Sequence, residues 1–226
     1  MNIYDFDNTI YDGDSCKDLV LFGLKKHPII TIKSLIKSNS LNRKYKKGII
    51  PFEPVKEELL SFIFKINNYE EFINMFVDTH INKIKKWYLE NKTDNDIIVS
   101  ASYDLWINKF ASKLKIKHVI TTNVDSNGKI IGKNCKREEK VRRLKSEYKN
   151  CIFETSYSDS ESDKPILEVA NSAYVVEGNI INNYSSNYKF KNKKWYVNKK
   201  RLTYHFVYCN IIWRRKEIIK WQLKLD

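Results

Sequence analysis

A chain of 226 residues, of which 42% are hydrophobic and 13% aromatic, can bury a sizeable core, so the composition excludes disorder along the whole length. Its 41 Lys and Arg against 27 Asp and Glu give a net charge of +14, which favours phosphorylated or otherwise anionic partners without identifying them. The four cysteines form no CxxC pair, the chain starts without the basic and apolar regions of a signal peptide, and no apolar run approaches membrane-spanning length. We therefore expect a cytoplasmic protein with unpaired thiols.

The first segment, MNIYDFDNTIYDGD, places Asp5 and Asp7 at the end of a short apolar run, with Thr9 two residues further on. If residues 3–6 form a buried strand, the chain leaving its carboxyl end directs both acids into one crevice. Such a pair suits magnesium-assisted phosphoryl transfer, because one carboxylate can attack phosphorus while the other moves a proton. Acids after a strand are also common as turn formers and helix caps, so later segments must decide.

Residues 15–93 carry apolar side chains at spacings of three and four, which predicts a helical insert. Pro28, Pro51 and Pro54 stand where helices of this insert are expected to begin or end. The aromatic side chains of the insert have two interpretations, because they either form its core or line a lipid-accommodating surface. They are Phe22, Phe62, Phe64, Phe72, Phe76 and Trp87.

From residue 94 to about residue 181, short apolar runs alternate with helical segments, which is typical of a parallel, doubly wound α/β sheet. The expected strands are residues 97–99, 117–123, 151–155 and 173–178, and the first of them ends at Ser100. The expected helices are 103–115, 138–149 and 161–171. A hairpin is expected at residues 126–128.

Three later segments supply what the two acids lack. Ser100 follows a strand, where its hydroxyl and the neighbouring amides can hold phosphate oxygens. Lys140 lies in the first turn of an expected helix and directs a cation toward its amino end. Asp159 and Asp163 are spaced as they would be across a loop and a first helical turn. Each segment alone also fits a helix cap or a solvated face, but their order favours one site.

In this order, the segments DFDNT, IIVSAS, EEKVRRL and SDSESD resemble the four motifs of the haloacid dehalogenase superfamily. The insert after the first motif is similar to the subclass with a helical cap there, which includes phosphoserine phosphatases and phosphatidylglycerophosphatase C. The later motifs are closer in style to the second of these. The resemblance implies a catalytic core at residues 1–14 and 94–189, a cap at residues 15–93, and a basic, aromatic extension at residues 190–226.

The resemblance also assigns roles to the acids. It implies that Asp5 is a nucleophile that forms an aspartyl-phosphate, and that Asp7 is the general acid and then the general base. Mg²⁺ is the implied cofactor, held by the Asp5 carboxylate, the Asp7 backbone carbonyl and Asp159. Asp163 would help to anchor the metal.

The remaining motif residues are expected to bind the phosphoryl group or the leaving group. Ser100 and Lys140 would hold the transferring oxygens, and Thr9 would shape the loop and contact Asp7. Asp14 occupies the place where phosphoserine phosphatases have an acidic residue that meets the substrate amine. It could equally cap the first helix of the insert.

We therefore expect a Mg²⁺-dependent phosphomonoester hydrolase that acts on a small phosphometabolite or a phosphorylated headgroup. Ala101, Ser102 and Ser160 stand where phosphoserine phosphatases usually have glycines, so the leaving group stays open. One alternative is a lipid-phosphate phosphatase at the membrane surface. A basic nucleic-acid or membrane-binding module without catalysis is disfavoured, because it rests only on charge and on the carboxyl-terminal extension.

Residues 190–226 mix Lys and Arg with Trp195, Trp213 and Trp221. This combination suits an anionic membrane surface, since rings can enter the interface while basic groups meet headgroup charge. We expect it to hold the enzyme at the membrane periphery, and we expect no nucleic-acid partner. The competing interpretation is that these aromatic side chains pack on the core.

Overall fold

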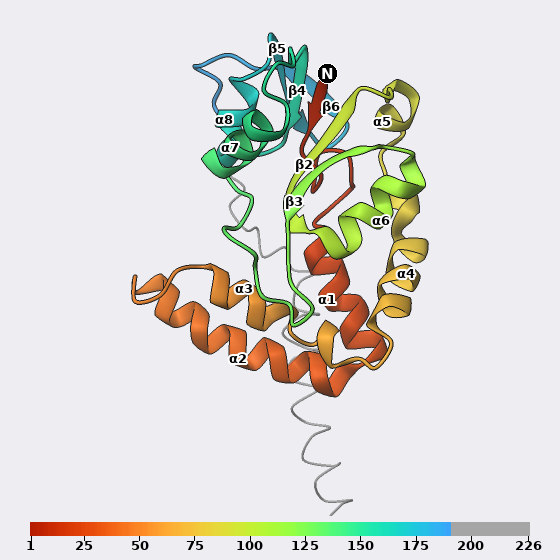
Figure 1. Ribbon diagram of the computed structural model, residues 1–226, viewed down its shortest axis with the longest axis vertical. Helices are drawn as coiled ribbons and strands as arrows, with labels where there is room; N and C mark the ends of the chain where they lie inside the picture. The colour runs from red at the N-terminus through yellow and green to blue at the C-terminus, as the bar shows by residue number, and fades with distance from the viewer. Residues whose placement is uncertain (191–226) are drawn as a thin grey trace, which may run out of the picture. The chain divides into compact units, whose positions relative to one another are not determined.

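The computed structural model describes residues 1–190, which surround a six-stranded sheet of strand order β3-β2-β1-β4-β5-β6 (Figure 1). The first five strands are parallel, and β6 runs antiparallel to β5. The strands are β1 (Asn2–Tyr4), β2 (Asp96–Tyr103), β3 (His118–Thr122), β4 (Thr155–Ser158), β5 (Ser172–Glu177) and β6 (Ile180–Asn183). The predicted doubly wound α/β fold is confirmed, with an antiparallel edge strand in addition.

Helices cover both faces of the sheet and extend beyond the carboxyl ends of its strands. Figure 1 shows α7 and α8 on one face, α4 to α6 on the other, and α1 to α3 beyond the carboxyl ends. The helices before β2 are α1 (Ser15–Lys26), α2 (Pro28–Lys46), α3 (Glu53–Leu60), α4 (Tyr69–His80) and α5 (Lys86–Asn91), with 3₁₀ turns at Ile63–Lys65 and Ile81–Lys83. The later helices are α6 (Asp104–Leu114), α7 (Glu138–Glu147) and α8 (Lys164–Leu167), with a 3₁₀ turn at Glu161–Asp163.

Alternation along the central strands separates two hydrophobic cores. Ile3 and Ile97 point to the core that α7 and α8 cover, whereas the adjacent Tyr4 and Ile98 point to the core on the opposite face. All four side chains are buried. Burial on both faces explains why these strands read as continuous apolar runs in the sequence.

The second core also contains much of the helical insert. Helix α4 packs against α6, and Tyr88 of α5 meets the ring of Tyr4 edge-on at 4.9 Å between centroids. The aromatic side chains of the insert are therefore part of the hydrophobic core, which was one of the two interpretations of the sequence. The buried ones are Phe22, Phe62, Phe72 and Phe76, while Phe64 and Trp87 are partly buried and pack against the same cluster.

Several predicted boundaries were wrong: the strand expected at residues 3–6 is Asn2–Tyr4, and three later segments differ more. The strand expected at 151–155 is instead Thr155–Ser158. This segment is rich in polar side chains, and it forms a strand because it pairs with β1 on one side and with β5 on the other. Strand β2 does not end at Ser100 but continues to Tyr103, with a shift of register against β3. The helix expected at 161–171 ends at Leu167, since the chain must reach β5 at Ser172.

The predicted membrane attachment through residues 190–226, with its three tryptophans, lies outside the described residues apart from Phe190. Residues 1–188 form one compact unit. Within the part of the chain that the structure describes, no helix combines the length and the apolar character needed to cross a membrane.

Candidate active site

The predicted catalytic residues come together at the carboxyl ends of β1, β2 and β4, which are neighbours in the sheet. Asp5 directly follows β1, and its amide donates to the carbonyl of Tyr157 in β4 (3.0 Å). Ser100 lies in β2, and Asp159 directly follows β4. The strand order reverses between β1 and β4, and open α/β sheets bind ligands at such a point.

A tight turn after β1 sets the direction of the first acids. The amides of Thr9 and Ile10 donate to the carbonyl of Phe6, and Asn8 takes a left-handed conformation with φ of 59°. This turn brings Thr9 back over the strand end, where its hydroxyl donates to Asp5 Oδ2 (3.1 Å). The expected contact of Thr9 with Asp7 was therefore wrong, because the turn places residues four apart side by side.

Asp5 belongs to a buried ion-pair network. The ammonium of Lys140, in the first turn of α7, lies 2.6 Å from Asp5 Oδ1 and 2.8 Å from Asp163 Oδ2. Ser158 donates a further hydrogen bond to Asp163 Oδ2 (2.8 Å). Lys140 is only 1% exposed, so these charges interact with little solvent screening.

The negative charge of this network exceeds its positive charge. Burial raises the pKa of Asp5, the Lys140 ammonium opposes the rise, and Asp163 and Asp159 add to it. Burial lowers the pKa of Lys140, but Asp163 and Asp5 outweigh it and raise that pKa overall. Two carboxyl groups thus contact the Lys140 ammonium and a third, that of Asp159, acts on Asp5, so that a divalent cation would balance their full ionisation.

The donor set fits a hard cation such as Mg²⁺. Carboxylate and carbonyl oxygens are its preferred protein ligands, and it commonly binds through one or two carboxylates while keeping waters. Residues 1–190 contain no ready-made group of three His, Cys, Asp or Glu side chains around a metal position. The predicted set differs from such a group, since it combines two side-chain carboxylates, Asp5 and Asp159, with the backbone carbonyl of Asp7.

Asp7 has different surroundings. It accepts hydrogen bonds from the Ser102 hydroxyl at Oδ2 and from the Ser15 amide at Oδ1, both at 2.6 Å. Burial raises the pKa of Asp7, Asp14 adds to the rise, and the two donors oppose it. A raised pKa is the shift that a proton donor needs, and the pKa of Asp5 shifts in the same direction.

Ser100 and Asp14 are the remaining predicted site residues. Ser100 is buried, and its hydroxyl accepts a hydrogen bond from the Ser102 amide (3.0 Å). Asp14 is the N-cap of α1, accepting from the Lys17 amide (3.0 Å) and pairing with the Lys17 ammonium (3.1 Å). The capping role of Asp14 is thus observed, whereas its contact with a substrate amine stays a prediction.

The sequence analysis did not identify Ser102 or Ser15 as partners of Asp7. A signal for Ser102 existed, because residues two apart in a strand share a face and Ser102 stands two after Ser100. Ser15 contributes its backbone amide at the start of α1. Helix starts offer unsatisfied amides to acidic groups, but side-chain chemistry does not show which acid they receive.

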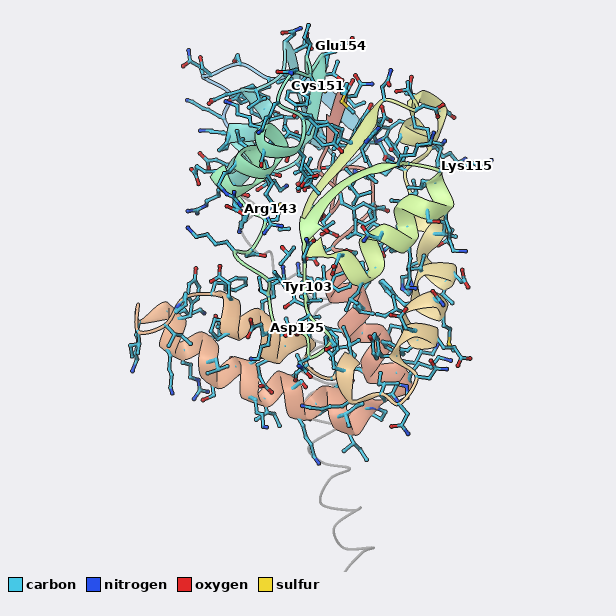
Figure 2. The ribbon with its side chains drawn as sticks, in the orientation of Figure 1. Tyr103, Lys115, Asp125, Arg143, Cys151 and Glu154 are labelled. Carbon is cyan, nitrogen blue, oxygen red and sulfur yellow. The ribbon has the colours of Figure 1, made fainter. Side chains whose placement is uncertain are left out.

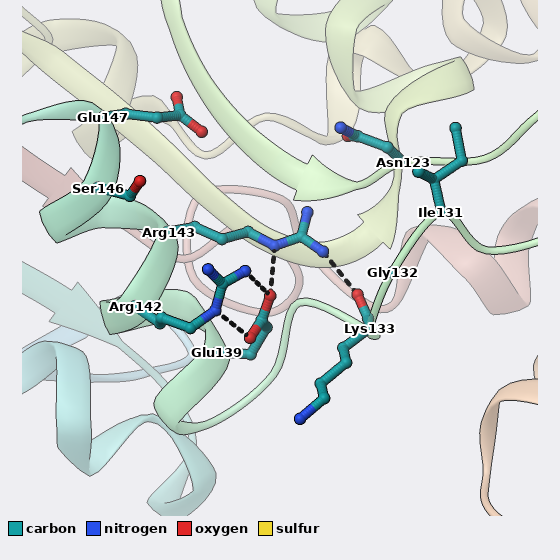
Figure 3. A pocket seen from close by; sticks show the side chains of 9 residues that line it. All are labelled: Asn123, Ile131, Gly132, Lys133, Glu139, Arg142, Arg143, Ser146 and Glu147. Atoms are coloured by element: carbon teal, nitrogen blue, oxygen red, sulfur yellow. Dashed lines mark hydrogen bonds and ion pairs between the residues drawn. The ribbon is translucent and has the colours of Figure 1, made fainter.

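A cavity of about 400 Å³ lies between α7 and the loop that follows β3, and none of the predicted catalytic residues lines it (Figure 3). Arg143 crosses it, donating to the backbone carbonyls of Thr121 and Lys133 (2.6 Å each) and pairing with Glu139 (2.8 Å). The cavity is lined by Asn123, Ile131, Gly132, Lys133, Glu139, Arg142, Arg143, Ser146 and Glu147. Arg143 thereby ties α7 to β3 and to the loop before the helix.

A sequence model of haloacid dehalogenase-like hydrolases matches residues 3–168, which include every residue of this site. The match spans more than half of the chain. The protein therefore belongs to the haloacid dehalogenase-like hydrolase family, as its motifs predicted. A search of curated proteins found no significant match.

Experimental structures share the fold at low sequence identity. A protein of unknown function from Bordetella pertussis Tohama I is 20% identical, with a TM-score of 0.64 over 76% of this chain and 87% of its own. A phosphoserine phosphohydrolase-like protein from Francisella tularensis subsp. tularensis SCHU S4 is also 20% identical, with a TM-score of 0.49 over 76% and 86%. The similarity to the first protein supports the fold.

Proposed function

We propose that this protein is a Mg²⁺-dependent phosphomonoester hydrolase that works through an aspartyl-phosphate on Asp5. The observation that carries the proposal is the contrast between two acids at one strand end. Asp5 contacts the buried ammonium of Lys140, whereas Asp7 is partly buried and accepts hydrogen bonds from two neutral donors. A nucleophile and a proton donor need these two kinds of surroundings.

The proposed reaction has two displacements at phosphorus. In the first, an oxygen of Asp5 bonds to phosphorus, the bond to the leaving oxygen breaks, and Asp7 gives that oxygen its proton. In the second, Asp7 takes a proton from water, the water oxygen bonds to phosphorus, and the bond to Asp5 breaks. Inorganic phosphate leaves, and both acids return to their starting states.

Positive charge is needed because a carboxylate that approaches a phosphate dianion is repelled. Lys140 is already placed beside Asp5 and, together with the hydroxyl of Ser100, would hold the transferring oxygens. Mg²⁺, held by the carboxylates of Asp5 and Asp159 and the carbonyl of Asp7, would supply the remaining charge, with Asp163 helping to anchor the site.

We further propose a small phosphorylated metabolite, and not a lipid phosphate, as the substrate. The aromatic side chains of the insert are buried or packed against the core, which removes one argument for a lipid-lined cap. Asp14 begins α1 next to Asp7 and could meet a leaving group that carries an amine. A cytoplasmic location, with attachment to anionic membranes through residues 190–226, remains part of this proposal.

The test uses purified full-length protein and p-nitrophenyl phosphate. Turnover should disappear in EDTA and return with Mg²⁺. Asp5→Asn should reduce turnover by about 10⁴-fold or more, since the attacking oxygen loses its charge. Equal turnover by Asp5→Asn and wild type would reject the mechanism, and a protein without phosphatase activity would favour the binding-module alternative.

A further inference from the structure

A buried lysine of the insert contacts the strand that carries the predicted phosphate-binding serine. Lys56 of α3 is only 7% exposed, and its ammonium donates to the carbonyl of Ala101 in β2 and to Asn134 Oδ1 (2.8 Å). It also lies 4.7 Å above the ring of Tyr103. Burial lowers the pKa of Lys56 to about 8, so at neutral pH it is mostly protonated and keeps its three donors.

The contact at Ala101 lies between two serines of the site. Ser100, before it, is expected to hold the phosphoryl group, and Ser102, after it, donates to Asp7 (2.6 Å). Tyr103, the ring beneath Lys56, ends the strand and is labelled in Figure 2. Because β2 shifts register against β3 in this stretch, its regular ladder fixes residues 100–102 less completely than an unbroken strand would.

A second support reaches the same carbonyl from the core. Thr122 of β3 donates to the Ala101 carbonyl (2.7 Å), and its hydroxyl also accepts from the Cys135 amide (2.9 Å). The Ala101 carbonyl therefore accepts one hydrogen bond from the core, through Thr122, and one from the insert, through Lys56. Loss of the Lys56 ammonium should shift residues 100–102 without unfolding the strand.

We propose that Lys56 is a positioning residue, which couples the docking of α3 to the orientation of Ser102 and thereby of the proton-donating acid Asp7. The inference rests on the proposed phosphatase function. The hydrogen bonds of Lys56 go to the Ala101 carbonyl and to Asn134 and not to Asp5 or Asp7, while its charge also acts on Asp7 over a longer distance. Its influence should therefore fall on protonation of the leaving group more than on attack at phosphorus.

Leaving groups provide the test, because p-nitrophenolate departs without a proton whereas an alkoxide must receive one. We expect Lys56→Met, which keeps the length of the side chain, to lower kcat/KM for an alkyl phosphate about ten- to hundredfold. For p-nitrophenyl phosphate the loss should stay within about threefold. Ser102→Ala should also lower kcat/KM for the alkyl phosphate more than for p-nitrophenyl phosphate. The double variant with Lys56→Met should show little further difference between the two substrates.

Glu57→Ala is the matched control. The adjacent residue on α3 also binds the loop after β3, through the Ile130 amide (3.0 Å) and Lys129 (2.8 Å), but it does not contact β2 through these groups. It should weaken docking of α3 without changing the ratio between the two substrates. Equal losses for both substrates in Lys56→Met, or the same discrimination in Glu57→Ala, would overturn the inference while leaving the phosphatase proposal intact.

Hydrogen exchange separates the inference from the proposed function. In Lys56→Met, amides of residues 100–103 should exchange faster than in wild type, whereas Glu57→Ala should leave them unchanged. This measurement needs no turnover, so a protein without Asp5-dependent activity would reject the phosphatase proposal but not the coupling of α3 to β2. Unchanged exchange at residues 100–103 in Lys56→Met would reject that coupling.

Discussion

The two acids of the site lie two residues apart, yet their surroundings differ in kind. Burial raises the pKa of Asp5, and charged groups act on it in both directions, since it contacts an ammonium group and lies near two further carboxylates. Burial also raises the pKa of Asp7, but its hydrogen bonds come from a neutral hydroxyl and a backbone amide instead of an ammonium group. One strand end can therefore present a carboxylate for attack and an acid for proton donation.

The largest expected difference separates the two acids by leaving group. Asp7→Asn should reduce kcat/KM for an alkyl phosphate by about 10²–10⁴-fold, because general acid catalysis is lost. For p-nitrophenyl phosphate the loss should be much smaller. Asp5→Asn should abolish turnover of both substrates alike. If steady-state assays gave both variants the same dependence on the leaving group, the contrast between the acids would not have a catalytic meaning.

The charged half of the site should also contribute to stability. Lys140→Met should lower turnover by about 10²–10³-fold at every Mg²⁺ concentration. It should reduce the free energy of unfolding by about 3–5 kcal/mol, since Asp5 and Asp163 lose a buried partner. Urea titration and metal titration measure the two effects. A fully active variant in excess Mg²⁺ would assign Lys140 to charge balance alone.

Asp159→Asn distinguishes metal binding from binding of the phosphoryl group. The substitution should raise the Mg²⁺ concentration needed for half-maximal turnover by about 10–100-fold, because a proposed ligand loses its charge. Excess Mg²⁺ should recover part of the activity, in contrast to Lys140→Met. A loss that no Mg²⁺ concentration reduces would mean that the two roles have been assigned the wrong way round.

A smaller effect is expected at Asp14, where capping and substrate recognition can be separated. Asparagine caps helices as well as aspartate does, so Asp14→Asn should keep α1 intact while removing the charge. If Asp14 meets an amine, kcat/KM for amino-bearing phosphate esters should fall about tenfold relative to matched esters without the amine. Equal values for the two sets would leave capping as its role.

The smallest effect concerns Glu139, an acid outside the site that neighbours Lys140 in the chain. Hydrogen bonds from Arg142 and Arg143 lower the pKa of Glu139 from 4.5 to about 2. Because the folded-state pKa is the lower one, this stabilisation is present above pH 4.5 and is lost as the pH falls toward 2. Glu139→Gln should cost at most about 1 kcal/mol at pH 7. Urea titrations should show a smaller difference from wild type at pH 3.

Local patterns in the sequence predicted much of the sheet and the edge where the proposed site lies. Apolar runs followed by acids or a serine indicated where β1 and β2 lie, because buried parallel strands have little freedom in composition. Strand β4 was misplaced because its segment is polar, and it pairs only because β1 and β5 supply partners from distant parts of the chain. Such pairing depends on the tertiary fold, which a local pattern does not contain.

The buried lysines of the insert also depend on the tertiary fold, so local patterns did not predict them. A lysine side chain usually faces water, yet Lys56 in α3 and Lys85 just before α5 are 7% and 6% exposed. Lys85 donates to the carbonyls of Asn8 and Gly178 (2.6 Å each), as Lys56 does to Ala101. The apolar face of α3 does include Lys56, one turn before the buried Leu60, but only the packed structure shows what the ammonium meets.

The central position of β1 has a consequence for how the protein is made. Ile3 pairs with Ile97 on one side and with Ser156 on the other, so both neighbours of β1 leave the ribosome long after it. Contacts between residues this far apart in the sequence require the loop-closure entropy to be lost before they stabilise the fold, which slows folding. A nascent chain that stalls before β4 would expose one edge of an apolar strand and invite aggregation. The strand that leads into the proposed nucleophile is thus synthesised before the strands that complete its pairing.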